Sequence, residues 1–282
     1  MLILAAIPLG NPADASAHLR TEIERVRYIA AEDSRKFARL CQDLGATHQA
    51  KVISFFEGNE GERLDGLLEL LKNGEDLLVV TDAGMPGISD PGYRLSREAI
   101  ALGIQVKVLP GPSAVTTALL LSGLPTDRFA FDGFPPRTQG ARATWFAHRA
   151  KEERTLVLFE APHRLLESLE DAASVFGGDR QAAICREMTK RYEETIRGSL
   201  SELVEWARNT EILGEISLVI AGFVADSGAL TEGAIIELVL AREAAGESRK
   251  EAIAEVAKAH NLAKREVFDA MVRFKTTDKI PQ

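Results

Sequence analysis

Three loops rich in glycine and proline each follow a short apolar run, and their residue types suit the binding of a small ligand. They are "IPLGNPAD" (7–14), "TDAGMPGISDPG" (81–92) and "LPGPSA" (109–114). Their glycines let the backbone approach a ligand closely, and their prolines reduce the entropy that a loop loses on binding. Asp82 and Asp90 add negative charge, which suits ribose hydroxyls or a cationic ligand better than phosphate. The second loop is longer than a plain connection requires, so we expect it to form part of a site.

Three polar clusters, at 30–36, 159–164 and 185–194, also follow apolar runs. Surface salt bridges would explain any one of them. Charged residues directly after strands, however, fall where ligands bind in open α/β sheets, which favours a chemical role. The cluster members are Glu32, Asp33 and Arg35, then Glu160, His163 and Arg164, then Arg186, Glu187 and Lys190.

Several common site patterns are absent from the sequence. It contains neither GxGxxG nor GxxxxGK[ST], so an ordinary dinucleotide or nucleoside-triphosphate site is disfavoured. His163 has no nearby cysteine or second histidine, so no zinc site is expected. No serine occupies a G-x-S-x-G turn, and neither cysteine lies in a reactive motif.

Short apolar runs alternate with helical patterns in the first half, which predicts an α/β fold with a mostly parallel sheet. A second, more mixed α/β unit follows a break at 123–140, and three helices rich in Ala, Glu, Lys and Arg complete the chain. We predict domains at 1–122, 123–225 and 226–282, the last resembling a helix-turn-helix around "HNLA". The expected strands are 2–7, 51–56, 76–81, 104–109, 154–160, 180–187, 193–198 and 215–222, and the expected helices include 34–45, 63–74, 93–103 and 164–177.

Composition limits the class of protein. The formal charge of −8 argues against a generally basic nucleic-acid coat, although it does not exclude a local basic face. Cys41 and Cys185 are far apart and lie in apolar segments, so we expect buried free thiols and a cytoplasmic protein. No apolar run approaches the roughly 18 residues of a membrane span.

Motifs along most of the chain resemble one family. "GNPAD", "AAEDSR", "TDAGMPGISDPGY", "PGPSA", "GLPTDRF", "GFPPR", "FEAPHRLLE", "REMTK" and "GEISLVIAG" are similar to the ribosomal small-subunit methyltransferase I family, over about residues 3 to 222. The three-helix tail also has a counterpart in many members. The chain has "GNP" and "GFPPRT" where the family usually has "GNL" and "GFLPRK", and "FFEGNE" lacks the usual histidine.

The resemblance implies a tetrapyrrole-methylase fold, in which two α/β domains enclose a cleft for S-adenosyl-L-methionine. It also implies 2′-O-methylation of a cytidine in 16S ribosomal RNA of the small subunit, and a homodimer. The cofactor candidates are Gly10, Asp82, Ala83, Gly84, Met85, Ser113 and Ala114, with Phe159, Met188 and Ile216 from the second domain.

A ribose hydroxyl is a poor nucleophile, so a group that accepts its proton is expected. The hypothesis is that the proton is accepted by Glu32, Asp33, Glu160 or His163. The phosphates that neighbour the ribose would be bound by Arg35, Arg164, Arg186 and Lys190. Basic residues of the tail and of 137–154, among them Arg142, are expected to hold RNA. Methylation of a tetrapyrrole or another small substrate, and a non-enzymatic RNA- or DNA-binding regulator, are the alternatives.

Overall fold

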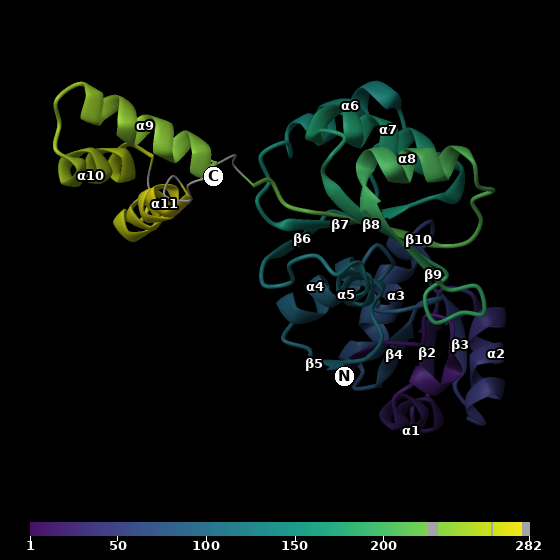
Figure 1. Cartoon of the computed structure of the whole chain (residues 1–282). Coiled ribbons are helices and arrows are strands. Elements are labelled where there is room, and N and C mark those ends of the chain that lie inside the picture. Colours follow the sequence, from purple (N-terminus) through teal and green to yellow (C-terminus); the bar gives the residue numbers. More distant parts are fainter. Residues whose placement is uncertain (225–230, 261, 278–282) are drawn as a thin grey trace. The chain divides into compact units, whose positions relative to one another are not determined.

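The computed structural model describes residues 1–224, 231–260 and 262–277 (Figure 1). Within these ranges, side chains are described through residue 274. Two compact units are present, Met1–Phe223 and Val224–Gln282. In the described part of the chain, every helix is too short or too polar to span a bilayer. The domain limits at 122 and 225 remain predictions.

The first sheet has five parallel strands in the order β3-β2-β4-β1-β5, as the alternating pattern predicts. Its central strands are wholly apolar and buried, because helices cover both faces. The strands are β1 (Leu2–Ala5), β2 (Tyr28–Ala31), β3 (Lys51–Ser54), β4 (Leu77–Val80) and β5 (Val106–Leu109). The helices are η1 (Pro12–Asp14), α1 (Ala17–Arg25), α2 (Ser34–Leu44), α3 (Glu60–Lys72), α4 (Tyr93–Ala101) and α5 (Ala114–Ser122).

Local signals set the helix ends. The Ser16 hydroxyl accepts the Leu19 amide at 3.0 Å and so caps α1. At α2 the cap is Asp33, because the Asp33 carboxylate accepts the amides of Arg35 and Lys36. Helix α2 ends at Gly45, whose φ of +59° suits glycine.

The second sheet is mixed, as predicted, in the order β6-β7-β10-β8-β9. Strand β10 runs antiparallel to both neighbours, and β6, from the segment at which the alternation breaks, pairs parallel with β7. The strands are β6 (Phe129–Phe131), β7 (Thr155–Glu160), β8 (Gln181–Arg186), β9 (Glu194–Ser199) and β10 (Ile216–Ile220). The helices are α6 (Gln139–Ala147), η2 (Pro162–Arg164), α7 (Leu165–Phe176) and α8 (Leu200–Arg208).

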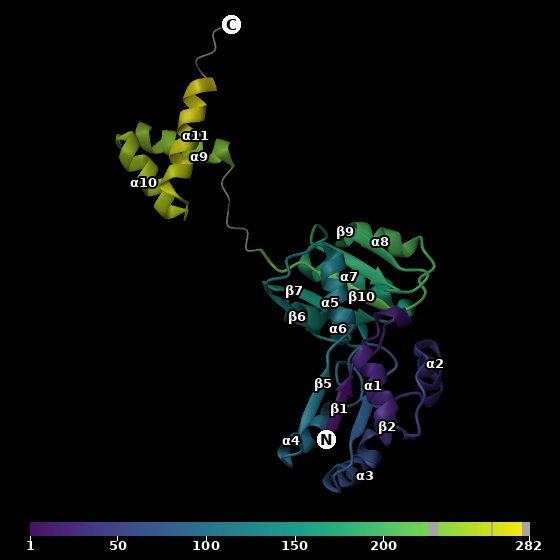
Figure 2. The ribbon, with the colours of Figure 1, turned by 90° about the horizontal axis from the view of Figure 1, so that it is seen from below.

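Helix α5 joins the two sheets. It follows β5 of the first sheet but lies against the second sheet (Figure 2). There Val115, Ala118 and Leu119 pack on Val157 and Val219. Helices α6, α7 and α8 bury the other face around Phe146, Leu169 and Leu203, among others. The helix that begins at one sheet therefore forms part of the core of the other.

In the residues that the structure describes, the C-terminal unit contains three helices, as expected: α9 (Glu232–Ala244), α10 (Arg249–Ala259) and α11 (Lys264–Thr277). Its own core contains Val239, Val256, Val267 and Met271. Residue 261 of the predicted "HNLA" turn lies outside the described residues.

One residue of the basic segment 137–154, Arg142, differs from the expectation that this segment holds RNA. Arg142 is fully buried, where its Nε donates to Asp171 at 2.7 Å and its Nη2 to Glu167 at 3.2 Å. Arg149 pairs with Asp132 and lies 3.5 Å from the centroid of the Trp145 ring. Arg142 thus stabilises the packing of α6 on α7, and its assignment to RNA is wrong.

Candidate active site

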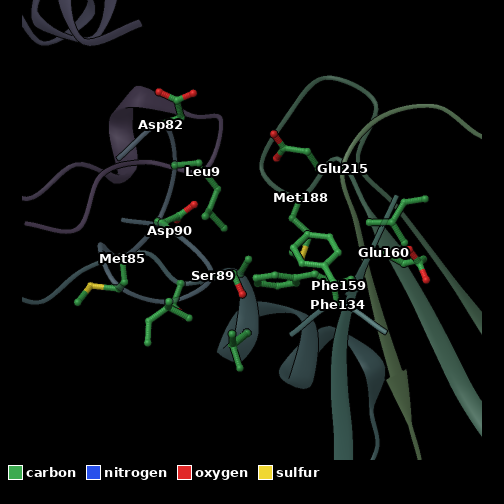
Figure 3. Close-up of a pocket in the computed structure, with 18 of the residues that line it drawn as sticks. Leu9, Asp82, Met85, Ser89, Asp90, Phe134, Phe159, Glu160, Met188 and Glu215 are labelled. Carbon is green, nitrogen blue, oxygen red and sulfur yellow. The ribbon is translucent and has the colours of Figure 1, made fainter. Parts of the chain in front are cut away.

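A cavity of about 400 Å³ lies between the carboxyl ends of the first sheet and the second sheet. Figure 3 shows Asp82, Met85 and Asp90 on one side of it and Phe134, Phe159 and Glu215 on the other. The remaining apolar lining includes Leu9, Ile88, Val115, Met188 and Ile216. Such a size and a mainly apolar lining with a few polar groups are typical of small-molecule sites.

The loop 81–92 is held in shape by backbone contacts. Ile7 and Gly84 exchange two hydrogen bonds, at 2.9 and 3.1 Å, and buried Glu60 accepts the Gly92 amide at 3.1 Å. The φ values of Gly84 and Gly92 are +70° and +126°, where a Cβ would be strained. Ser89 has a φ of +62°, although it is not a glycine, and lines the cavity. Backbone strain of this kind clusters at functional sites.

Glu32, Asp82 and Lys36 form one network at the edge of the cavity. The Asp82 amide donates to Glu32 at 3.0 Å, and the Lys36 ammonium donates to the Asp82 carboxylate at 2.7 Å. Burial, together with the negative charge of Asp82, raises the pKa of Glu32 above its ordinary value, although the hydrogen bond from Asp82 opposes the rise. Glu32 therefore binds a proton more readily than an exposed glutamate.

Asp90 is a half-buried carboxylate on the cavity wall. Among the described residues it has no hydrogen-bond or ion-pair partner. Burial, and after it the charges of Glu32, Asp82 and Glu215, raises the pKa of Asp90 to about 7. An unpaired carboxylate in a cavity is suited to accept a proton or to face a cationic ligand.

Glu160, at the end of β7, is 3% exposed and fully engaged by its neighbours. Its carboxylate accepts the Ala161 amide at 2.8 Å and the Ser168 hydroxyl, and it pairs with Arg164 at 3.3 Å. Arg164 in turn donates from Nη2 to the carbonyls of Pro135 and Pro136 at 2.7 and 3.1 Å. This arrangement fixes the wall of the cavity.

The segment 185–194 is also tightly held. Lys190 donates to Glu187 at 2.9 Å and pairs with Glu215 at 3.0 Å. Burial works against the charge of Lys190, but these two hydrogen bonds raise its pKa. Arg186 pairs with Glu194 at 2.6 Å. A Cβ on Gly10 would lie 2.3 Å from the Lys190 Cγ, so this glycine allows the first loop to pass close to the second domain.

The structure brings most of the predicted cofactor residues together. The predicted residues that line the cavity are Glu32, Asp82, Ala83, Gly84, Met85, Ser113, Ala114, Phe159, Glu160, Met188 and Ile216. The other predicted residues do not line it: Gly10, Asp33, Arg35, His163, Arg164, Arg186 and Lys190.

Two of the proton-acceptor candidates, Asp33 and His163, do not line the cavity. Asp33 is used as the cap of α2 and as the partner of Arg35, whose hydrogen bonds hold the pKa of Asp33 well below its usual range. His163 is exposed on η2.

Phe134 and Glu215 line the cavity but were not assigned from the sequence, and Asp90 was expected to add charge near the ligand but was not among the cofactor or proton-acceptor candidates. Phe134 is 53% exposed, and its ring meets Phe159 edge-on at 5.7 Å. The available signals were the loop position of Asp90 and the phenylalanine in "GFPPR". Glu215 lies in the motif "GEISLVIAG", directly before the cofactor candidate Ile216, but no role was assigned to it.

Residues 1–204 match the profile of a family described as Tetrapyrrole (Corrin/Porphyrin) Methylases. Proteins named Ribosomal RNA small subunit methyltransferase I are similar over most of the chain. That of Mycobacterium tuberculosis is 47% identical over 96% of this chain and 94% of its own length. That of Pseudomonas aeruginosa is 41% identical over 85% of this chain and 86% of its own. That of Thermotoga maritima is 40% identical over 221 residues, which cover 98% of it but 78% of this chain.

Solved structures with the same fold are more distant in sequence. A cobalt precorrin-4 methyltransferase has a TM-score of 0.57 and 16% identity over 78% of this chain and 93% of its own. A diphthine synthase has a TM-score of 0.60 and 17% identity over 79% of this chain and 90% of its own. These similarities establish the fold.

Proposed function

The chain belongs to the ribosomal RNA small subunit methyltransferase I family of tetrapyrrole methylases, and we propose that it 2′-O-methylates the ribose of a cytidine in 16S ribosomal RNA. The observation that carries the proposal is the 47% identity to the Mycobacterium tuberculosis protein along nearly the whole chain. The cavity between the two sheets supports it, because its size and its mainly apolar lining suit a small methyl donor.

The cavity fits S-adenosyl-L-methionine by its chemistry. Apolar side chains such as Met85, Met188 and Ile216 suit an adenine ring, and the carboxylates of Glu32 and Asp90 suit a cationic ligand that carries no phosphate. Ala83, Gly84, Ser113 and Ala114 would hold it through backbone groups and small side chains. When bound, S-adenosyl-L-methionine supplies an electrophilic methyl group.

The chain's own residues have to orient the ribose hydroxyl and accept its proton. Glu32 and Asp90 suit the second task, because both line the cavity and both have a raised pKa. Glu160 instead acts as a positioning residue, since its oxygens are held by Ala161, Ser168 and Arg164. Much of the acceleration is then expected from positioning.

The proposed partner is 16S ribosomal RNA in the small subunit, and the proposed location is the cytoplasm. Cys41 and Cys185 are both buried free thiols, and burial raises the pKa of each to about 11, which keeps them unreactive. A homodimer is part of the proposal. Exposed apolar side chains on consecutive elements support it, namely Tyr93 and Ile100 of α4, Val108 of β5 and Leu120 of α5.

Titration calorimetry of the full chain with S-adenosyl-L-methionine tests the cofactor site. Binding that is weakened by Met85→Glu, a charge placed on the cavity wall, is the expected result. Absence of binding heat over a range of temperatures would favour a non-enzymatic regulator. Methylation of a precorrin but not of ribosomal RNA would favour the small-substrate alternative.

A further inference from the structure

The C-terminal unit has an open groove between α10 and α11 that is separate from the active site. Its lining includes Ser248, Arg249 and Lys250 at the start of α10, and Lys264, Arg265 and Phe268 at the start of α11. Both helices therefore present their N-terminal turns to the groove, where the helix dipoles favour negative charge.

The groove is positively charged although the chain is acidic. It is lined by four cationic side chains and by two carboxylates, Glu251 and Asp269, whereas the whole chain has a formal charge of −8. Arg249 donates from Nε and Nη2 to the carboxylate of Glu243, so the cations that remain for a ligand are Lys250, Lys264 and Arg265. Glu251 is used in a capping box with Ser248. Within the described residues, the ammonium groups of Lys250 and Lys264 have no hydrogen-bond or ion-pair partner. The Arg265 side chain is 92% exposed, and its ion pair with Asp269 is long, at 3.9 Å. These cations are available to a ligand.

An exposed aromatic ring lies beside these cations. Phe268 is 54% exposed, although Val267, Ala270 and Met271 of the same helix are buried in the core of the unit. Lys264 precedes Phe268 by one helical turn, so both lie on the face of α11 away from that core. A flat ring next to cations combines base stacking with phosphate contact, which is how single-stranded nucleic acids are bound.

The comparison with the Thermotoga maritima protein suggests that this unit is an accessory to the chemistry. Its alignment of 221 residues covers 98% of that protein, and this length is close to that of the unit Met1–Phe223. A relative named as a small-subunit methyltransferase of the same type thus has no counterpart for about a fifth of this chain.

We propose that the groove between α10 and α11 binds a single-stranded RNA segment, with Lys250, Lys264 and Arg265 on its phosphates and Phe268 stacked on a base. The identity of that RNA as part of the small-subunit ribosomal RNA rests on the proposed function. The groove itself is defined without it, by its charges and its exposed ring.

The test uses the full chain and a fluorescein-labelled single-stranded RNA of about twelve nucleotides, a length that such grooves cover. Fluorescence anisotropy should show that Phe268→Leu weakens binding by roughly 5- to 100-fold, the loss of one stacked base. Phe268→Trp should retain the affinity, because it keeps the ring. Lys264→Ala should reduce the slope of log K against log salt by about 0.7, as expected for one lost contact to a single strand.

Lys258→Ala is the matched control, because Lys258 is an exposed lysine of α10 outside the groove. It should leave the affinity for the labelled RNA, and the loss of affinity caused by Phe268→Leu, unchanged. Equal affinity of wild type and Phe268→Leu would overturn the proposal, as would equally tight binding of duplex RNA or duplex DNA that does not depend on Phe268. Methylation of small subunits is measured on the same samples. A wild type that binds RNA through Phe268 but does not methylate ribosomal RNA would contradict the proposed function and leave the groove supported.

Discussion

The backbone amide of Asp82 donates a hydrogen bond to the carboxylate of Glu32 at 3.0 Å. These two residues follow the neighbouring strands β4 and β2, so the bond joins the two strand ends at the cavity. Asp33 donates its own amide to the Asp82 carboxylate at 3.1 Å. Glu32 is thereby held in one orientation at the wall of the cavity, as its proposed role of proton acceptor requires.

Glu32→Gln should lower turnover by roughly 10²- to 10⁴-fold, because the amide keeps an acceptor for the Asp82 amide but does not take a proton at neutral pH. Affinity for S-adenosyl-L-methionine should change by no more than about twofold, since the network that shapes the loop is retained. Single-turnover kinetics and calorimetry measure the two quantities.

Asp33→Asn is the control for Glu32, because it alters the adjacent carboxylate, which caps α2 outside the cavity. Asparagine is also a good cap, so turnover should stay close to that of the wild type. A Glu32→Gln enzyme that turns over as fast as the wild type would remove Glu32 as proton acceptor.

Asp90 should make the folded protein less stable as the pH rises from its ordinary pKa of 3.8 to about 7. Over this range the folded state retains a proton that the unfolded state has released, so ionisation disfavours the fold. Asp90→Asn removes this effect and should be more stable than the wild type by about 1–2 kcal/mol near pH 8, after reduction for its partial exposure to solvent. Near pH 4 the two proteins should be equally stable.

Urea unfolding of both proteins at the two pH values measures this difference. The carboxylates whose charges raise the pKa of Asp90, namely Glu32, Asp82, Glu215 and Glu57, are present in both proteins, so the difference isolates Asp90. A gap between the proteins that does not change with pH would show that Asp90 titrates normally.

Glu160→Ala should destabilise the protein by about 3–5 kcal/mol, because it leaves Arg164 with a mostly buried charge and no carboxylate. Glu160→Gln should cost much less, because the amide can still bond to Ser168 and Ala161. Thermal unfolding measures both. Glu170→Ala on α7 breaks an exposed pair with Arg208 and should cost less than about 1 kcal/mol. An alanine variant at Glu160 as stable as the Glu170 variant would contradict the buried network.

A protein that ends at Phe223 should fold and should bind S-adenosyl-L-methionine as tightly as the full chain, because every residue that lines the cavity lies in the first unit. Its affinity for single-stranded RNA should fall. Circular dichroism and calorimetry on the shortened chain measure folding and binding. A loss of cofactor binding in a protein that remains folded would show that the C-terminal unit contributes to the site.

The sequence predicted which sheet edge bears the site, but it did not predict the direction of each side chain. Glu32, Asp82, Met85 and Ser113 follow strands of one parallel sheet, and the carboxyl ends of such strands meet at a common edge. Asp33 is adjacent to Glu32, yet it caps α2 and does not reach the cavity. Adjacent residues at a strand end point in different directions, and residue spacing alone does not show which one reaches the ligand.

The sequence also did not predict side-chain contacts that tertiary packing creates. Glu160 seemed a proton acceptor because it follows a strand, but Ser168 and Arg164 occupy its oxygens. Arg142 was expected to hold RNA, but its side chain is fully buried and pairs with Glu167 and Asp171. Glu215 directly precedes β10, which lies between β7 and β8 in the second sheet. Its place at the cavity depends on this strand order, which local sequence patterns do not predict. These assignments depend on tertiary packing.

The most direct measurement is transfer of a labelled methyl group from S-adenosyl-L-methionine to small ribosomal subunits isolated from cells that lack this activity. After digestion to nucleosides, mass spectrometry should find the label as 2′-O-methylcytidine from 16S ribosomal RNA, and Glu32→Gln should greatly reduce it. Label that is absent from cytidine ribose, while the same enzyme methylates a precorrin, would contradict the proposed function.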